Sequence, residues 1–429
     1  MSISLAKRCD CCRNHSHSTI VSTARPGEDG GGECGKPERA TQDRVIALFR
    51  DQLGYEYLGN WHGRTDTRNV NEPLLRGHLL GAGYPEARVS HAISRLRAAT
   101  DRSIASKGAL YDNNKAVYSL LRYGIDLPAE PGGKSPKIEL IDWKVPGNNH
   151  FALAEEVSLR GGLTRRVDLV LFVNGIALGT LELKNSRTDV GIAIRQSISN
   201  QSPEYNAAFY STVQFIMAGN DTEGLRYGTI GTEEKFFLQW KEDEAENSGY
   251  KYLLKLCAPA RFLEIVHDFV LFDGGKKKLP RAHQYFGVKA SQEHVRRREG
   301  GIVWHTQGSG KSIVMVLLAR WILETLPNAR IAILTDRDEL DKQIMGVFSD
   351  MGESPERAAS GRDLMDKLSL PFPRLLCSLI HKFGRRTVDD FAEYIRRLED
   401  APPPVSGELF IFVDECHRTQ GSNALRTQQ

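Results

Sequence analysis

Residues 301–312, with the sequence GIVWHTQGSGKS, constrain the fold more than any other segment of the chain. An apolar strand pattern leads into a glycine-rich turn, and the apolar helical pattern SIVMVLLARWILETL follows. Such a loop directs backbone N–H groups and a helix N-terminus toward phosphate groups. Lys311 would contact the β- and γ-phosphates of ATP, and Ser312 would bind Mg²⁺. His305 stands where the phosphate-loop pattern has its first glycine, and the predicted ATP-binding residues are Gly308, Ser309, Gly310, Lys311 and Ser312.

A second motif follows an apolar run in the segment FIFVDECHRTQ. Asp414 would hold Mg²⁺, and Glu415 would polarise the water that attacks ATP. Two acids that only cap a strand are the alternative, and the upstream phosphate loop argues against it. Between the two motifs, the strands RIAILTD and RLLCSLI alternate with helical stretches. This alternation predicts a parallel, doubly wound sheet over residues 291–429.

The chain ahead of this domain has a different pattern. TQDRVIALFRDQLGY has helical spacing, and Gly54 is placed to end that helix. Asn174 and Gly175 predict a two-residue hairpin between two apolar strands. A mixed-sheet α/β domain is therefore expected over residues 41–258. Residues 259–290 are predicted to be a linker, with RFLEIVHDFVLF as a helix and GGKKKLPR as a basic connection. The segments that predict the domain are the strands KIELIDWK, FALAEEVSLRG, RRVDLVLFVNG, IALGTLELKN and STVQFIMAGN, and the helix VGIAIRQSISNQ.

Three charged residues lie within the apolar hairpin RRVDLVLFVNGIALGTLELKN. Asp168 is on its first strand; Glu182 and Lys184 are two residues apart on the second, so they leave the same face. The Asn-Gly turn folds the strands back, so the three side chains can converge at one end of the sheet. Two carboxylates suit Mg²⁺, which activates water against a phosphodiester, and the lysine would orient that water or stabilise the transition state. The alternative is a solvated strand, but unpaired charges among these apolar residues would be costly.

These motifs resemble known families. DECH resembles the motif II box of superfamily 2 helicases and translocases, and LTDRDELDKQ resembles their motif after the phosphate loop. Gln284, in PRAHQYFGVKA, is similar to the glutamine that reads adenine in that superfamily. The hairpin resembles the PD-(D/E)xK nuclease core of type I restriction endonuclease R subunits (the HsdR family). GIAIRQSISNQ, STVQFIMAGNDTEGLRYGTIGT and VDECHRTQGSN follow that family in order, so the resemblance covers residues 41–429.

The resemblance implies an ATP- and Mg²⁺-dependent enzyme that translocates duplex DNA and cuts it when it is unmodified. It implies a RecA-like motor lobe, truncated after motif II, with methylase and specificity subunits as partners. S-adenosylmethionine would enter only through that partner complex. Without the family's second motor lobe, residues 1–429 alone are expected to show no DNA-stimulated ATPase activity. A stand-alone DNA-repair helicase–nuclease, and a remnant that binds DNA or nucleotide without catalysis, remain as alternatives.

The family adds a glutamine to its nuclease motif, and Gln196 or Gln201 would match it. Gln201 and Tyr205 have the family's Q-x-x-x-Y spacing, but the sequence does not decide between the two glutamines. Glu155 and Glu156 form a further acid pair, for which an exposed strand or loop surface is the simpler interpretation.

Composition adds few constraints. The net charge of +3 is too small to indicate nucleic-acid binding by itself. There is no apolar run of membrane-spanning length and no apolar signal at the N-terminus, and three of the cysteines are scattered, so a cytoplasmic protein is expected. The other four lack the paired spacing of a zinc site, and residues 1–40 are predicted to be a disordered extension; these cysteines are Cys9, Cys11, Cys12 and Cys34.

Overall fold

The computed structural model describes the chain from residue 38 to residue 414, with gaps. The cysteine cluster near the N-terminus and Glu415 lie outside the described residues. No helix within the described part of the chain is both long and apolar enough to cross a membrane. The described ranges are 38–65, 67–102, 104, 107–127, 136–160, 163–242, 249–306, 308–335, 338–350, 355–379 and 406–414.

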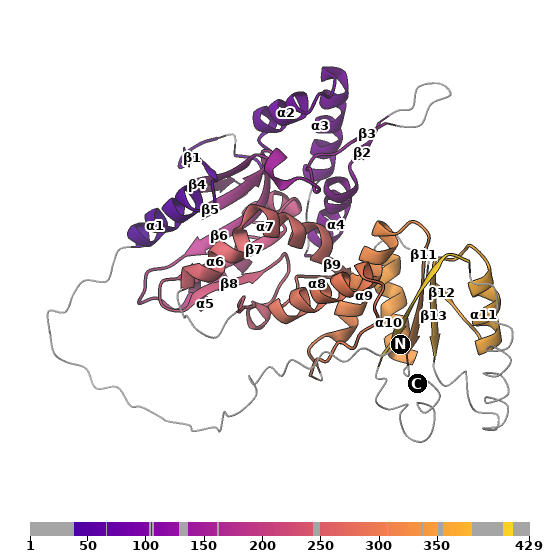
Figure 1. The fold of residues 1–429 in the computed structure, drawn as a ribbon. Coiled ribbons are helices and arrows are strands. Elements are labelled where there is room, and N and C mark those ends of the chain that lie inside the picture. Colours follow the sequence, from indigo (N-terminus) through magenta and orange to yellow (C-terminus); the bar gives the residue numbers. More distant parts are fainter. Residues whose placement is uncertain are drawn as a thin grey trace, which may run out of the picture.

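The first half of the chain is built around a mixed sheet of six strands, as predicted (Figure 1). The central pairs β4–β5 and β5–β6 are antiparallel, as is β7–β8, whereas β1–β4 and β6–β7 are parallel. In spatial order the strands are β1 (Glu56–Asn60), β4 (Phe151–Arg160), β5 (Thr164–Val173), β6 (Ile176–Leu183), β7 (Phe215–Asn220) and β8 (Gly224–Gly228).

Helices cover this sheet. Helix α1 begins at Glu38, three residues before the predicted start, and buries Val45, Ile46 and Phe49. Helix α5 packs against β6 and β7, and its first turn is capped by the carboxylate of Asp189. The helices of this half are α1 (Glu38–Asp51), α2 (Glu72–Gly81), α3 (Glu86–Thr100), α4 (Lys107–Tyr123), α5 (Val190–Ser199) and α6 (Gly249–Cys257).

Two turns decide where strands begin and end in this half. Asn174 and Gly175 both have positive φ angles, 51° and 80°, which matches the tight hairpin turn that the sequence predicts. The predicted strand KIELIDWK is wrong beyond β3 (Lys137–Ile138), which pairs only with β2 (Ile125–Asp126). The reason is a turn around Asp142, whose carboxylate accepts the backbone N–H groups of Lys144 and Val145.

The predicted linker is an ordered part of the structure. Only α7 (Pro259–Glu264) and a π-helical turn, η4 (Ile265–Phe269), are helical in the segment predicted as one helix. The chain then forms a hairpin of β9 (Leu271–Asp273) and β10 (Lys276–Lys278), because two glycines with positive φ angles make its turn. Lys277 is buried, and its Nζ donates a 2.8 Å hydrogen bond to Asn114 Oδ1. The basic run thus anchors the hairpin on the first half.

The described residues of the second half contain four strands that are all parallel, as the strand–helix alternation predicts (Figure 1). Their spatial order is β12 (Glu356–Arg357), β13 (Leu375–Leu379), β11 (Ala329–Thr335) and β14 (Glu408–Val413). The accompanying helices are α8 (Ala282–Arg296), α9 (Lys311–Thr325), α10 (Asp338–Asp350) and α11 (Gly361–Ser369).

The predicted strand GIVWH is absent from this sheet. Residues 301–306 have no regular secondary structure, and Trp304 is 85% exposed. Apolar, β-branched residues favour a strand only where a neighbouring strand supplies hydrogen bonds. Among the described residues, the segment takes part in no ladder. The prediction is therefore wrong for this structure.

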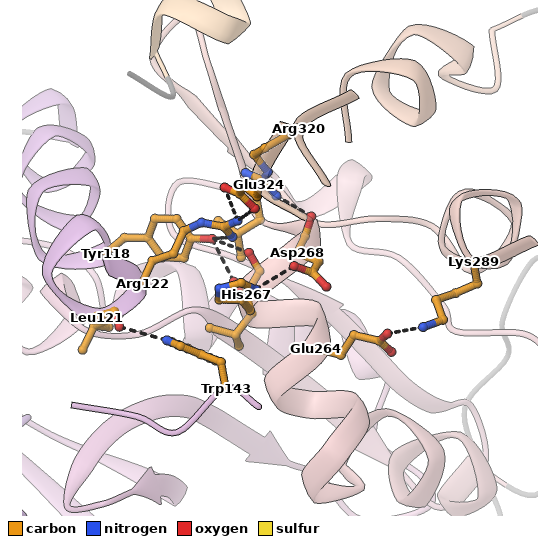
Figure 2. Close-up of polar contacts among 12 residues, drawn as sticks. Tyr118, Leu121, Arg122, Trp143, Glu264, His267, Asp268, Lys289, Arg320 and Glu324 are labelled. Atoms are coloured by element: carbon orange, nitrogen blue, oxygen red, sulfur yellow. Dashed lines mark hydrogen bonds and ion pairs between the residues drawn. The ribbon is translucent and has the colours of Figure 1, made fainter. Parts of the chain in front are cut away.

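A buried polar network joins the two halves (Figure 2). Arg122 of α4 donates hydrogen bonds of 2.7 and 2.5 Å to the two carboxylate oxygens of Glu324, in the last turn of α9. Arg320, one turn earlier in α9, donates to the carbonyl of Val270 at 3.1 Å. Tyr118 of α4 donates to the carbonyl of Val266 at 2.9 Å. The far end of α9 is therefore held by the first half of the molecule.

Candidate active site and phosphate loop

A β-bulge determines which face of β6 carries its charged residues. The tight turn pairs Val173 with Ile176, and in that register Asp168 would lie opposite Leu181. The register shifts by one residue at Leu178, so that Leu169 pairs with Leu181 instead. The shift places Asp168 next to Glu182 on one face of the sheet.

Glu182 is 1% exposed, and two neutral amides hold its carboxylate. Gln196 Nε2 donates to Oε2 at 2.7 Å, and Asn200 Nδ2 donates to Oε1 at 2.7 Å. Gln201 points elsewhere: its amide donates to the carbonyl of Ser197 at 3.0 Å. Of the two glutamines that the sequence left open, the structure therefore brings only Gln196 to the carboxylate.

Lys184 lies beside the two acids, and its ammonium donates to Glu38 Oε1 at 2.6 Å. Burial by itself would lower the pKa of Lys184, but the hydrogen bond that it donates to Glu38 and the charge of Asp168 outweigh burial and raise that pKa. The lysine is therefore cationic. Glu38 and Asn200 were not found by sequence reasoning, since neither belongs to the D…E-x-K spacing. The one available signal for Asn200 was its i,i+4 relation to Gln196 on a predicted helix.

The two acids form a site that fits a divalent cation. Burial raises the pKa of Asp168 to about 6, and burial and the Asp168 charge raise the pKa of Glu182 well above its usual value. A divalent cation nearby would lower both pKa values, and it would so offset the cost of burying two ionised carboxylates. Within the described residues, no group of three or more His, Cys, Asp or Glu side chains is arranged as metal ligands. A pair of carboxylates is nevertheless enough for Mg²⁺, which usually keeps several water ligands.

The site opens into a cleft of about 730 Å³ with a basic rim. Asp168, Lys184 and Gln196 line it, and the cationic side chains around them are Arg39, Arg165 and Arg166. Acidic groups at the centre and guanidinium groups at the rim suit a phosphodiester backbone bound across a metal.

The acid pair next to this cleft is not simply surface. Glu155 is 2% exposed, which corrects the interpretation as an exposed strand residue. Burial would raise its pKa, but hydrogen bonds from Arg39, Tyr57 and Asn60 outweigh that effect and lower it. Glu156 lines the cleft and forms an ion pair with Arg166 at 3.2 Å.

The phosphate loop precedes α9. Gly308 and Gly310 have φ angles of 76° and 84°, which side chains other than glycine rarely adopt. Gln284 Nε2 donates to the carbonyl of Ser309 at 2.9 Å, and its Oε1 accepts the backbone N–H of Arg281. A Cβ atom at position 310 would collide with this amide. The glutamine predicted to read adenine therefore lies against the loop, with both ends of its amide engaged.

The topology brings the second predicted nucleotide motif to the same edge of the sheet. Helix α9 leads back to the start of β11, so its N-terminus, with Lys311 and Ser312, lies toward the carboxyl end of that strand. Strand β14 runs parallel to β11, with Val413 opposite Leu334, and Asp414 follows directly. The backbone N–H of Asp414 donates to the carbonyl of Leu334 at 3.0 Å.

Comparison with known proteins finds a family-model match in each half of the chain. Residues 36–235 match the family model for the N terminus of the type I restriction enzyme R protein. Residues 283–428 match the model for the SWI2/SNF2 ATPase. The two matches coincide with the mixed-sheet half and the parallel-sheet half.

Full-length relatives agree with these matches. The HindI endonuclease subunit, a type I restriction enzyme of Haemophilus influenzae, is 30% identical over 86% of this chain and 38% of its own length. The putative type I restriction enzyme MjaIXP endonuclease subunit of Methanocaldococcus jannaschii is 27% identical over 71% of this chain and 32% of its own. The chain thus spans about a third of the curated relatives that it matches. From its two matched regions and these relatives, the chain belongs to the family of type I restriction enzyme R proteins and carries that family's N-terminal portion.

Proposed function

We propose that this chain supplies the DNA-cleaving site and part of the ATP site of a type I restriction enzyme, with a PD-(D/E)xK nuclease domain ahead of a RecA-like motor lobe. The observation that carries the proposal is the bulged hairpin. It sets Asp168 and Glu182 side by side with Lys184 next to them, and Asp168 and Lys184 line a cleft rimmed by arginines. The names of the relatives, which are endonuclease subunits, support the same class of activity.

In this proposal Asp168 and Glu182 hold the metal through carboxylate oxygens. Bound Mg²⁺ would supply Lewis acidity and a more acidic water. Lys184, kept cationic by Glu38, stabilises the negative charge that develops on the phosphate. Gln196 fixes the orientation of Glu182. The rim arginines bind the neighbouring phosphates of the DNA strand.

The second half would bind ATP and Mg²⁺ with Lys311, Ser312 and Asp414, and Glu415 would act on the attacking water. We propose that hydrolysis drives translocation of double-stranded DNA, and that cleavage follows it. Methylase and specificity subunits would complete the complex, and S-adenosylmethionine would bind to those partners and not to this chain. The family models support this division of labour between the two halves.

The test separates the two sites in the complete R subunit assembled with its partners. Asp168→Ala, Glu182→Ala and Lys184→Ala should each reduce the rate of DNA cleavage on the order of 10³-fold. ATP hydrolysis should stay near the wild-type rate, because these residues lie on the other sheet. Glu56→Ala removes an exposed acid from the same sheet outside the cleft and is the matched control. Undiminished cleavage by any of the three variants would show that the cleavage site lies elsewhere.

A further inference from the structure

We propose that Asn200 is a positioning residue of the cleavage site: it holds Glu182 so that the carboxylate presents a free lone pair on each oxygen to a divalent cation. This inference rests on the proposed nuclease function and adds a residue that the D…E-x-K motif does not contain.

The geometry places Asn200 and Gln196 on one face of a helix. They are four residues apart, and Asn200 is the C-cap of α5, its backbone N–H donating to the carbonyl of Gln196. Their side-chain amides each donate to a different oxygen of Glu182, both at 2.7 Å. Asn200 is fully buried, so no water substitutes easily for its amide.

The chemical type of these two donors matters. A carboxylate oxygen has two lone pairs, so one hydrogen bond on each oxygen leaves one lone pair for a metal. Amides carry no charge, so they satisfy Glu182 without neutralising it. An arginine or lysine in the same place would satisfy the carboxylate but repel a cation. The two amides also offset the partial negative charge at the C-terminal end of α5, which by itself disfavours an anion such as the Glu182 carboxylate.

The neighbouring residue supplies a matched control. Gln201 is also buried at the end of α5, but its amide donates to the carbonyl of Ser197, and its oxygen accepts the backbone N–H of Gly231 at 2.9 Å. Neither of these two side-chain hydrogen bonds of Gln201 involves Glu182. Replacing Gln201 therefore removes a similar amount of local structure without touching the carboxylate.

The test measures Mn²⁺ binding to the purified 429-residue chain by calorimetry, with Mn²⁺ as the probe for the site. Asn200→Leu keeps the branching and the number of heavy atoms of the side chain and removes its donor. It should weaken Mn²⁺ binding about tenfold, the scale of one hydrogen bond to a charged group. Gln201→Ala should bind Mn²⁺ as the wild type does. Asn200→Ser, whose hydroxyl is too short to reach Oε1, covers the case in which the leucine variant does not fold, and it should also bind more weakly.

A double variant shows whether Asn200 acts through Glu182. Glu182→Gln should lose binding at this site, and adding Asn200→Leu to it should cause no further loss. A further loss, or wild-type Mn²⁺ affinity in Asn200→Leu or Asn200→Ser, would overturn the positioning role. Equal Mn²⁺ binding by the wild type and Glu182→Gln would instead overturn the proposed nuclease site, so the two failures are distinguishable. In the complete subunit, Asn200→Leu should raise the Mg²⁺ concentration for half-maximal cleavage more than it lowers the maximal rate.

Discussion

In the first sheet, β6 lies between β5 and β7 and all of its residues are buried, whereas β14 in the second sheet lies at an edge and exposes Ile411 and Val413. The carboxylate of Glu182 is fixed by side chains from a packed helix. The phosphate loop is fixed instead by Gln284, which bonds to the loop carbonyls where a nucleotide would bind. The proposed cleavage site is therefore preorganised by its own sheet and the helix packed on it, while the proposed ATP site would have to exchange contacts within its loop to bind a nucleotide.

Shifting the strand register beyond the bulge should have the largest effect, because it separates the two carboxylates that the first sheet holds side by side. Insertion of one alanine between Gly179 and Thr180 would place Leu181 opposite Asp168 and turn Glu182 onto the face of the apolar core, at the position that Leu183 now occupies. We expect a loss of more than about 4 kcal/mol in unfolding free energy, or no folded first half. Gly179→Ala is the control, since its Cβ would meet only ordinary contacts at 3.5 Å. Circular dichroism melting would compare them, and a stable insertion variant with an intact cleft would refute the role of the strand register.

A substitution in the phosphate loop should affect the activities proposed for both halves of the protein. Lys311→Ala removes the charge that we propose faces the β- and γ-phosphates, so the complete subunit should lose ATP hydrolysis by about 10³-fold. DNA cleavage should fall with it if cutting follows translocation. Lys342→Ala, at an exposed site on α10, should leave both rates unchanged. Phosphate release and plasmid cleavage measured together decide the matter: cleavage that survives without hydrolysis would uncouple the halves.

The buried acids predict an inverse pH dependence of stability for the first half. The folded pKa of Asp168 is about 6 and its unfolded pKa is near 4, so its contribution is present below pH 4 and is lost as the pH rises through 6. In metal-free buffer at pH 8, Asp168→Asn should therefore be more stable than the wild type by on the order of 2–3 kcal/mol. Mg²⁺ should remove this difference by stabilising the wild type.

Urea unfolding between pH 4 and pH 8 would measure the effect. Asp101→Asn, which changes an exposed acid, should follow the wild-type profile. If Asp168→Asn gained no stability over the wild type at high pH, burial of the ionised Asp168 carboxylate would not destabilise the folded protein.

The smallest expected effect concerns the contact between the halves. Arg122→Ala should destabilise the chain by about 1–2 kcal/mol, less than a fully buried pair would, because the Glu324 side chain is 30% exposed and can be solvated. The swap of Arg122→Glu with Glu324→Arg should recover part of this loss. Arg76→Ala, a half-exposed arginine with two acidic partners on the surface, should cost less than about 0.5 kcal/mol. Calorimetry would show whether the two halves still melt together, and an unchanged melt for Arg122→Ala would mean that the ion pair does not couple them.

Local patterns in the sequence predicted the elements better than their pairing. The Asn-Gly turn, the apolar strands on either side of it and the helix after the phosphate loop were all predictable, because their causes lie within a few residues. The register of β6 was not predictable from local patterns, although a glycine inside a strand is a known signal of a bulge. The roles of Glu38 and Asn200 depend on helices that approach from distant parts of the chain. Residues 301–305 have the composition of a strand, but among the described residues they pair with no other strand. A local sequence pattern cannot show whether a distant strand is there to pair with.

Helix α9 has a consequence for how the molecule moves. It is 15 residues long, about 22 Å, and it joins the phosphate loop at one end to Arg122 of the first half at the other. An α-helix of this length bends little, so it works as a lever. A small tilt of the loop when phosphate arrives or leaves cannot be absorbed along the helix. Such a tilt would be transmitted to the Glu324 end, and through it to the half that holds the proposed cleavage cleft.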